Sequence, residues 1–162
     1  MKNFLKSALC LLALALMLGS CRSVTEASSD AAYANFKPQC LGVAMDGTQN
    51  LRVFGKGKGK AQAIEQAKKN AVSEVIFNGI QGSGDCNKRP LVNEVNARER
   101  YEDYFNAFFA TGGAYTKYVR LDENRTSRIK AQTDDLVQYG VTVSIDRAAL
   151  RARLQDDGIL PK

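Results

Sequence analysis

The chain has 162 residues, with 23 Lys and Arg against 17 Asp and Glu, and it contains no histidine. The missing histidine excludes Ser/His/Asp and Cys/His catalysis and the usual zinc ligand sets, and it removes the commonest general base at neutral pH. The length suits a single domain that buries its core without a structural metal.

Residues 1–20 have the composition of a secretory signal peptide. Lys2 and Lys6 precede an unbroken apolar run from Ala8 to Leu18, and small residues follow. The run is too short to span a bilayer comfortably. Its removal takes away two of the 23 basic side chains and none of the 17 acidic ones, which lowers the net charge from +6 to about +4.

The stretch Leu18-Gly19-Ser20-Cys21 resembles the lipobox of bacterial lipoproteins. The resemblance implies that the signal is cut before Cys21, that palmitate-type chains are attached to its sulfur, and that its new amine is acylated. Three acyl chains, at roughly 0.8 kcal/mol per buried methylene, would hold the protein at a membrane permanently. The alternative is an ordinary secreted protein that is cut before a cysteine.

Arg22, rather than an aspartate, follows the lipidation site, which resembles the enterobacterial pattern passed on to the outer membrane. We therefore expect a lipid-anchored protein of the bacterial cell envelope, at the outer membrane and facing the periplasm. Residues 21–38 are rich in Ser, Ala, Thr and Asp and are predicted to form a flexible tether. Residues 39–162 are predicted to form a single domain.

Alternation around the turn dipeptide Asp46-Gly47 predicts a hairpin of residues 41–45 and 51–54. Apolar residues at helical spacing predict one helix over 60–80 and another over 92–110, the second carrying Val95, Tyr101, Tyr104, Phe105, Phe108 and Phe109. Such an aromatic stripe is far more often core than a stacking platform. Small residues at Ala61, Ala67 and Ala71 would let the first helix approach a sheet closely.

Strands are predicted over 115–121, 127–131 and 136–145, with turns at Asp-Glu-Asn and Thr-Asp-Asp between them. A short helix from Asp146, a plausible N-cap, to Gln155 closes the chain, with Leu150 and Leu154 facing inward. This order predicts an α+β fold with a small antiparallel sheet and its helices packed on one face.

The stretch FGKGKGKAQAIEQAKKNA, residues 54–71, places alternate glycines before a helix, as in some phosphate-binding loops. The Walker A pattern fails because Ala61 follows Gly59-Lys60, and the dinucleotide fingerprint fails because its sixth position is Lys60 or Gln62. We interpret the glycines as a corner between strand and helix. The basic side chains of this region are a candidate anion contact, although a solvated loop is the simpler interpretation: Lys56, Lys58, Lys60, Lys68 and Lys69.

The same glycine-then-alanine helix resembles the signature of a small bacterial lipoprotein family that shares a domain with the N-terminal part of flagellar assembly protein T. Over a longer span the chain resembles uncharacterised Bacteroidetes-type lipoproteins, in EQAKKNAVSEVIFNGI, RPLV, NARERYEDYFNAFFA and VTVSIDRAALRARLQDDGI. These motifs are structural, and the resemblance implies no known activity.

The chain has four cysteines, of which two belong to the predicted signal and lipidation site and two remain in the predicted domain. Cys10 departs with the signal and Cys21 is the lipidation site, so Cys40 and Cys86 form an even pair in an oxidising compartment. We predict a Cys40–Cys86 disulfide, which would close a loop of about 47 residues and stabilise the fold by up to roughly 4 kcal/mol. The alternative is two separate buried thiols.

The acidic residues carry no catalytic pattern. Glu99 and Asp103 on the second predicted helix are typical of a solvated face, and Asp134-Asp135 and Asp156-Asp157 lack the spaced oxygens of a calcium loop. We expect a non-enzymatic accessory or scaffold module that contacts other envelope proteins, with no cofactor, metal ion, nucleotide or nucleic acid. The alternative is a binding module for anionic envelope polymers such as lipopolysaccharide or peptidoglycan.

Overall fold

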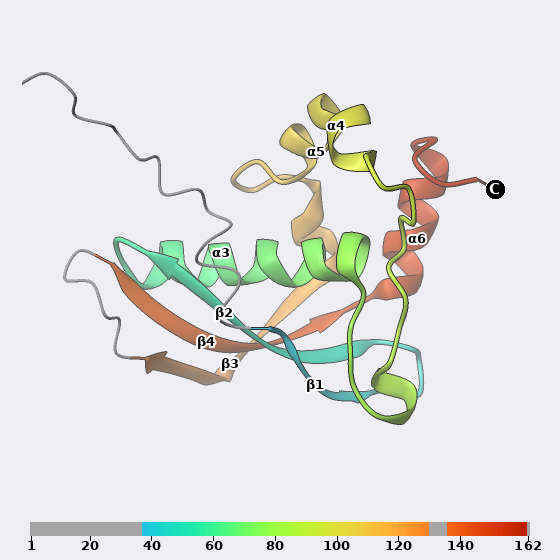
Figure 1. Cartoon of the computed structure of the whole chain (residues 1–162). Helices are drawn as coiled ribbons and strands as arrows, with labels where there is room; N and C mark the ends of the chain where they lie inside the picture. Colours follow the sequence, from blue (N-terminus) through green and yellow to red (C-terminus); the bar gives the residue numbers. More distant parts are fainter. Residues whose placement is uncertain (1–36, 130–135, 162) are drawn as a thin grey trace, which may run out of the picture. The chain divides into compact units, whose positions relative to one another are not determined.

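A four-stranded antiparallel sheet with helices on one face forms the domain, in a computed structural model that describes residues 37–129 and 136–161 (Figure 1). The predicted signal peptide, Cys21, most of the tether and the Asp134-Asp135 turn lie outside these residues. The strand order is β1-β2-β4-β3, and every neighbouring pair is antiparallel. The predicted α+β class is therefore confirmed.

Strands β1 (Gln39–Val43) and β2 (Gln49–Gly57) form the predicted hairpin. Gly47 adopts a φ of +83°, a conformation that favours glycine, and its amide donates to the Ala44 carbonyl oxygen. Along β2, buried and half-buried residues alternate. The buried ones face the helices, as the period of two predicts.

Strands β3 (Val119–Ile129) and β4 (Val137–Ile145) complete the sheet. The prediction of two strands over 115–121 and 127–131 was wrong. Residues 114–118 form the 3-10 helix η4 (Ala114–Tyr118), and the Asp-Glu-Asn segment is a bulge within one continuous strand. The register shift between Asp122 and Thr126 takes up these extra residues, so no turn is needed.

Helix α3 (Lys60–Ser73) lies across the sheet and continues directly into one π-helical turn, η2 (Glu74–Asn78). A loop containing the 3-10 turn η3 (Gly84–Cys86) leads to two short helices, α4 (Ala97–Arg100) and α5 (Glu102–Phe108). The single helix predicted over 92–110 is therefore wrong in extent. Tyr101, at φ −116° and ψ 34°, interrupts it, and Val95 precedes the first turn and is fully exposed.

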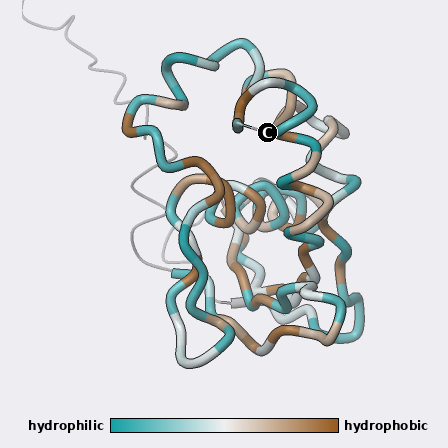
Figure 2. The backbone as a smooth tube through the Cα atoms, turned by 90° about the vertical axis from the view of Figure 1, so that its right-hand side faces the viewer, coloured by the Kyte–Doolittle hydropathy of each residue, from teal (hydrophilic) through white to brown (hydrophobic). Residues whose placement is uncertain are grey.

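Helix α6 (Arg147–Asp156) ends the fold as predicted. The Asp146 side chain caps it by accepting from the Ala149 amide at 2.9 Å, and Leu150 and Leu154 are fully buried. Figure 2, which views the domain from the α6 side, shows hydrophobic segments between the sheet and the helices and mostly hydrophilic outer loops.

The glycines of β2 explain how closely α3 approaches the sheet. A Cβ on Gly55 would overlap the backbone of Ala63 and Ala67, and one on Gly57 would lie 2.7 Å from the Ala63 amide nitrogen. Ala63, Ala67 and Ala71 are fully buried. The predicted alanine face was thus correct at 67 and 71, but Ala61 is exposed and Ala63 takes its place.

Candidate functional site

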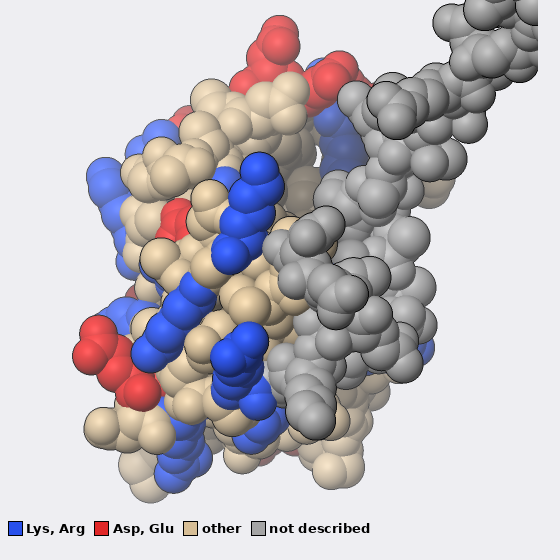
Figure 3. All heavy atoms as spheres, turned by 90° about the vertical axis from the view of Figure 1, so that its left-hand side faces the viewer, with Lys and Arg blue, Asp and Glu red and all other residues tan. Residues whose placement is uncertain are grey.

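The turn from β2 into α3 carries the candidate anion contact. Gly59 is the N-cap of α3 with extended backbone, no side chain caps the helix, and its first turn contains no acidic residue. The helix therefore begins with unsatisfied amides and the positive end of its dipole. Figure 3, which faces this end of the domain, shows basic side chains gathered over it.

The five candidate lysines fall into two groups. Lys58 and Lys60 are exposed at the turn, and Lys56 is half-buried on the last part of β2. Lys68 instead forms an ion pair with Glu65 at 3.0 Å, and Lys69 lies 5.9 Å from the centre of the Tyr115 ring. The turn thus presents three of these lysines, whereas the other two already contact groups of their own domain.

The glycines of the turn serve packing. Gly55 and Gly57 face α3, so the space above them is filled by Ala63 and Ala67. A phosphate-binding loop needs its glycine backbone open to the ligand. Only Gly59, around which no atom lies within 4 Å of a built Cβ, is open in this way.

Several carboxylates among the described residues pair with side chains of their own domain. Glu94 pairs with Arg100 at 2.7 Å, and Asp157 accepts from the Arg153 Nε at 2.7 Å and from the Tyr104 hydroxyl at 2.6 Å. Glu99 and Asp103 are exposed on α4 and α5. Within the described ranges, no three acidic or cysteine side chains gather in a group that could hold a metal ion.

Two tyrosines lie where their phenols are protected from ionisation. Burial, and then the hydrogen bond to Glu65, raises the pKa of Tyr115 far above its usual range, and burial with Asp157 does the same for the pKa of Tyr104. Burial raises the pKa of the Glu65 carboxyl, but hydrogen bonds from Tyr115 and Lys68 outweigh it and the net shift is downward. A phenol in this state is a hydrogen-bond donor rather than a base.

The aromatic stripe forms core contacts. Phe105 and Phe108 are buried, and the Phe105 ring lies 4.8 Å from that of Phe77 and 5.1 Å from that of Tyr104. Tyr115, at the start of η4, is fully buried. These rings fill the space beside α3 instead of presenting a platform to solvent.

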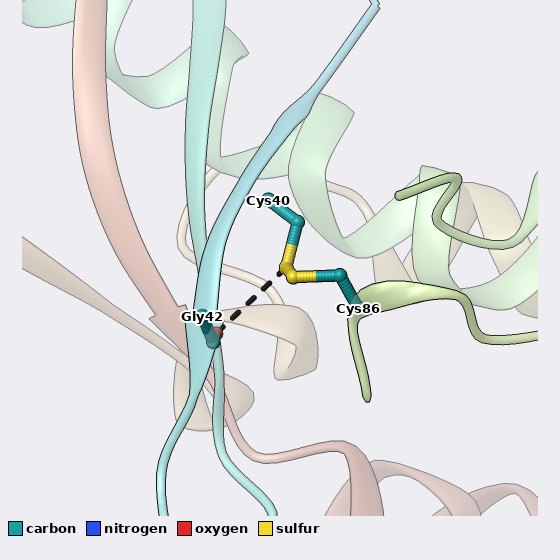
Figure 4. Close-up of a disulfide and its surroundings, with 3 residues drawn as sticks. All are labelled: Cys40, Gly42 and Cys86. Atoms are coloured by element: carbon teal, nitrogen blue, oxygen red, sulfur yellow. Dashed lines mark hydrogen bonds between the residues drawn. A yellow bond between two sulfur atoms is a disulfide. The ribbon is translucent and has the colours of Figure 1, made fainter. Parts of the chain in front are cut away.

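The predicted disulfide between Cys40 and Cys86 is present, with the two Cα atoms 5.8 Å apart (Figure 4). It links edge strand β1 to the loop after η2, and the Cys40 sulfur lies 3.8 Å from the Gly42 carbonyl oxygen. Gly82 lies beside the bridge, where a Cβ would come within 2.7 Å of the Cys86 Cβ. The bridge therefore closes a 46-residue separation around the whole of α3 and η2.

The sequence pattern does not predict one buried polar side chain. Glu74 is only 8% exposed, although it lies among the apolar residues that predicted a buried helix face. The helical pattern marks Val72, Val75 and Ile76 as core, and nothing in that pattern distinguishes an adjacent buried carboxylate.

Comparison of the chain with protein-family models, with curated proteins and with solved structures finds no match. Among the described residues, none of the helices has the length and apolar character needed to cross a membrane.

Proposed function

We propose that the chain is a lipid-anchored protein of the bacterial cell envelope, held through Cys21 at the outer membrane and facing the periplasm. In this proposal it acts as a non-enzymatic accessory or scaffold module that contacts other envelope proteins. Its kinship would lie with the small lipoproteins that its sequence resembles.

The Cys40–Cys86 disulfide is the observation that supports this proposal most directly. Structural disulfides form and persist in oxidising compartments such as the bacterial periplasm, and they are rare in the cytosol. A disulfide in the fold therefore agrees with an exported chain, which the apolar segment 8–18 and the Leu18–Cys21 motif predict independently.

The β1–β2 hairpin offers a surface for contact with another protein. Leu41 is 49% exposed at the bulge of β1, and Met45 is fully exposed in the turn. Two of the four exposed large apolar side chains among the described residues thus lie on this hairpin, and in this proposal they contact the partner protein.

Replacement of the lipidation site tests the anchor. Cys21→Ser should abolish acylation, leaving the protein soluble or uncut, so that it no longer partitions into a detergent phase. Cys10→Ser, a matched change inside the predicted signal, should partition as wild type does. A Cys21→Ser protein that still enters the detergent phase would refute the anchor.

Crosslinking in the native cell tests the scaffold role. Wild type should co-purify with an envelope protein, and Leu41→Ser with Met45→Ser should reduce its recovery. Val95→Ser, at a site 97% exposed in the loop before α4, is the control. Recovery of lipids with no protein partner contradicts the proposal.

The uncapped start of α3 favours a second candidate function, binding of anionic envelope polymers through Lys56, Lys58 and Lys60. Such binding must weaken steeply as salt is added. We expect Lys58→Ala with Lys60→Ala to weaken binding to lipopolysaccharide or peptidoglycan fragments, and Lys68→Ala, which loses a lysine paired with Glu65, to change it little. Absence of binding to these polymers at low salt rejects this candidate.

A further inference from the structure

A hollow of about 250 Å³ opens where the helical run of α3 and η2 ends. Its walls are the side chains of Glu74, Asn78, Lys37 and Pro38 and the segment 79–81. It lies at the opposite end of this helical run from the lysines of the β2–α3 turn. It is also separate from the exposed hairpin residues Leu41 and Met45, which do not line it.

Glu74 contributes a buried carboxylate to this hollow. Its only hydrogen bond from another side chain comes from the Asn78 Nδ2 to Oε1 at 2.9 Å, within the part of the chain that the structure describes. The four ion pairs among the described residues involve other acids, namely Glu65, Glu94, Asp122 and Asp157. Glu74 therefore has no ion-pair partner among the described residues, and its one side-chain hydrogen bond leaves its other carboxylate oxygen without a side-chain donor.

Hydrogen bonds at the end of the helix hold this carboxylate in place. The Glu74 carbonyl accepts from the Gly79 amide at 2.7 Å, and the carbonyls of Val75 and Ile76 accept from Leu91 and Val92. Gly79 has a φ of +74°, and a Cβ there would lie 2.5 Å from the Lys88 carbonyl oxygen. These bonds fix the last turn of the helix, and with it the position of the Glu74 side chain, in a π-helical turn of the kind often found at functional sites.

We infer that this hollow binds the ammonium group of a ligand with a short alkyl stem. The ammonium would donate to the Glu74 carboxylate, and its stem would lie against the half-buried Pro38 ring. The volume is below the range of drug-sized sites and suits a ligand about as large as a lysine side chain. This site is independent of the anchor and the protein contacts proposed above.

The ammonium fits the hollow better than other cations do. A guanidinium binds a carboxylate best through both oxygens, and Asn78 already occupies one of them. A metal ion needs several oxygen ligands, and no three acidic or cysteine side chains of the described residues lie close enough together to hold one. Lys37 lines the hollow but forms no ion pair with Glu74, so its charge opposes a bound cation.

The site is tested by titrating the mature protein, in detergent micelles at low salt, with 1,5-diaminopentane. Calorimetry and the NMR chemical shifts of segment 74–81 measure the binding. Glu74→Gln keeps the bond with Asn78 but removes the charge, so it should weaken binding at least tenfold. Glu99→Gln, at an exposed carboxylate on α4, should bind as wild type does, and Lys37→Ala should bind more tightly. The neutral analogue 1-pentanol should not bind.

Thermal unfolding separates loss of the site from loss of the fold. Because Glu74→Gln removes a buried unpaired charge, its midpoint should equal or exceed that of wild type. Absence of diamine binding to folded wild type, binding by Glu74→Gln within twofold of wild type, or loss of binding in Lys37→Ala would each overturn the site. A parallel titration with N-acetyl-lysine methylamide identifies the kind of ligand. Tighter binding than that of the diamine indicates a lysine side chain of a protein, and weaker binding indicates a free amine.

Discussion

Helix α3 is held on two sides by interfaces of opposite composition. Toward the sheet it presents alanines to glycines, with Ala63 and Ala67 against Gly55 and Gly57, so that backbone meets backbone. On the other side aromatic rings fill the space, led by Tyr115, which donates to Glu65. The first interface depends on the absence of side-chain volume and the second on its presence, so we expect them to fail under opposite substitutions.

Truncation on the aromatic side should have the largest effect. Phe105 is 6% exposed and packs against the rings of Phe77, Tyr104 and Phe109. Phe105→Ala should lower the free energy of unfolding by about 4 kcal/mol, since it loses buried area and leaves a cavity. Phe105→Leu, which keeps most of the volume, should cost less than about 1.5 kcal/mol. Urea unfolding curves with unchanged slope measure both. Equal costs for the two variants would contradict the aromatic interface.

Addition of one methyl group should damage the sheet side almost as much. Gly55→Ala should cost about 3 kcal/mol, because its Cβ meets the backbone of Ala63 and Ala67 and no flexible side chain can yield. Gly59→Ala is the matched control from the same glycine series: no atom lies within 4 Å of its built Cβ, and its cost should stay below about 1 kcal/mol. A Gly55→Ala protein as stable as the control would show that α3 moves away freely.

This contrast also explains what the sequence could predict. The alternation of β2 and β4 and the 3.6-residue period of α3 and α6 are local signals, and the elements appear where they predict. The even cysteine pair, together with the predicted export of the chain, was sufficient to predict the disulfide, because two remaining cysteines allow one intramolecular pairing. The burial of Ala63 rather than Ala61 could not be predicted from the helix sequence alone. It depends on which face of α3 packs against Gly55 and Gly57, which belong to another element.

The break between α4 and α5 and the π turn after α3 could not be predicted either, because the local sequence pattern does not distinguish them from a continuous helix. The break at Tyr101 divides an apolar stripe whose period fits one continuous helix, so the sequence pattern does not reveal the break. Glu74, three residues after the buried Ala71, lies in the π turn beside the buried Val75 and Ile76, where the sequence pattern alone predicts an apolar residue. In the basic cluster, the sequence placed five lysines together, but Lys69 extends toward Tyr115, a residue 46 positions later in the chain.

Removal of one hydroxyl group tests the polar contact of the aromatic side. Tyr115→Phe keeps the buried ring but loses the hydrogen bond to Glu65, and it should cost about 1.5 kcal/mol. Tyr118→Phe, whose hydroxyl bonds to no described residue, should be nearly neutral. A double-mutant cycle with Glu65→Gln isolates the pair, and a coupling energy near zero would show that the ring alone matters.

Acid should selectively reduce the stability that the aromatic side of α3 contributes, and this is the smallest effect that we expect. The hydrogen bonds from Tyr115 and Lys68 outweigh burial and hold the pKa of Glu65 below its ordinary value of 4.5. A carboxyl with a lowered folded pKa stabilises the protein above its unfolded pKa, and this stabilisation is lost as pH falls below about 4.5 toward the folded pKa. Wild type should therefore lose more stability than Glu65→Gln between about pH 6 and pH 3, whereas Glu102→Gln, at an exposed acid on α5, should follow wild type. The cost of Tyr115→Phe should shrink over the same range because its acceptor becomes neutral, while the cost of Gly55→Ala should stay constant because no titrating group takes part in that contact. If both costs change in parallel with pH, the two sides of α3 are coupled and the contrast between them is wrong.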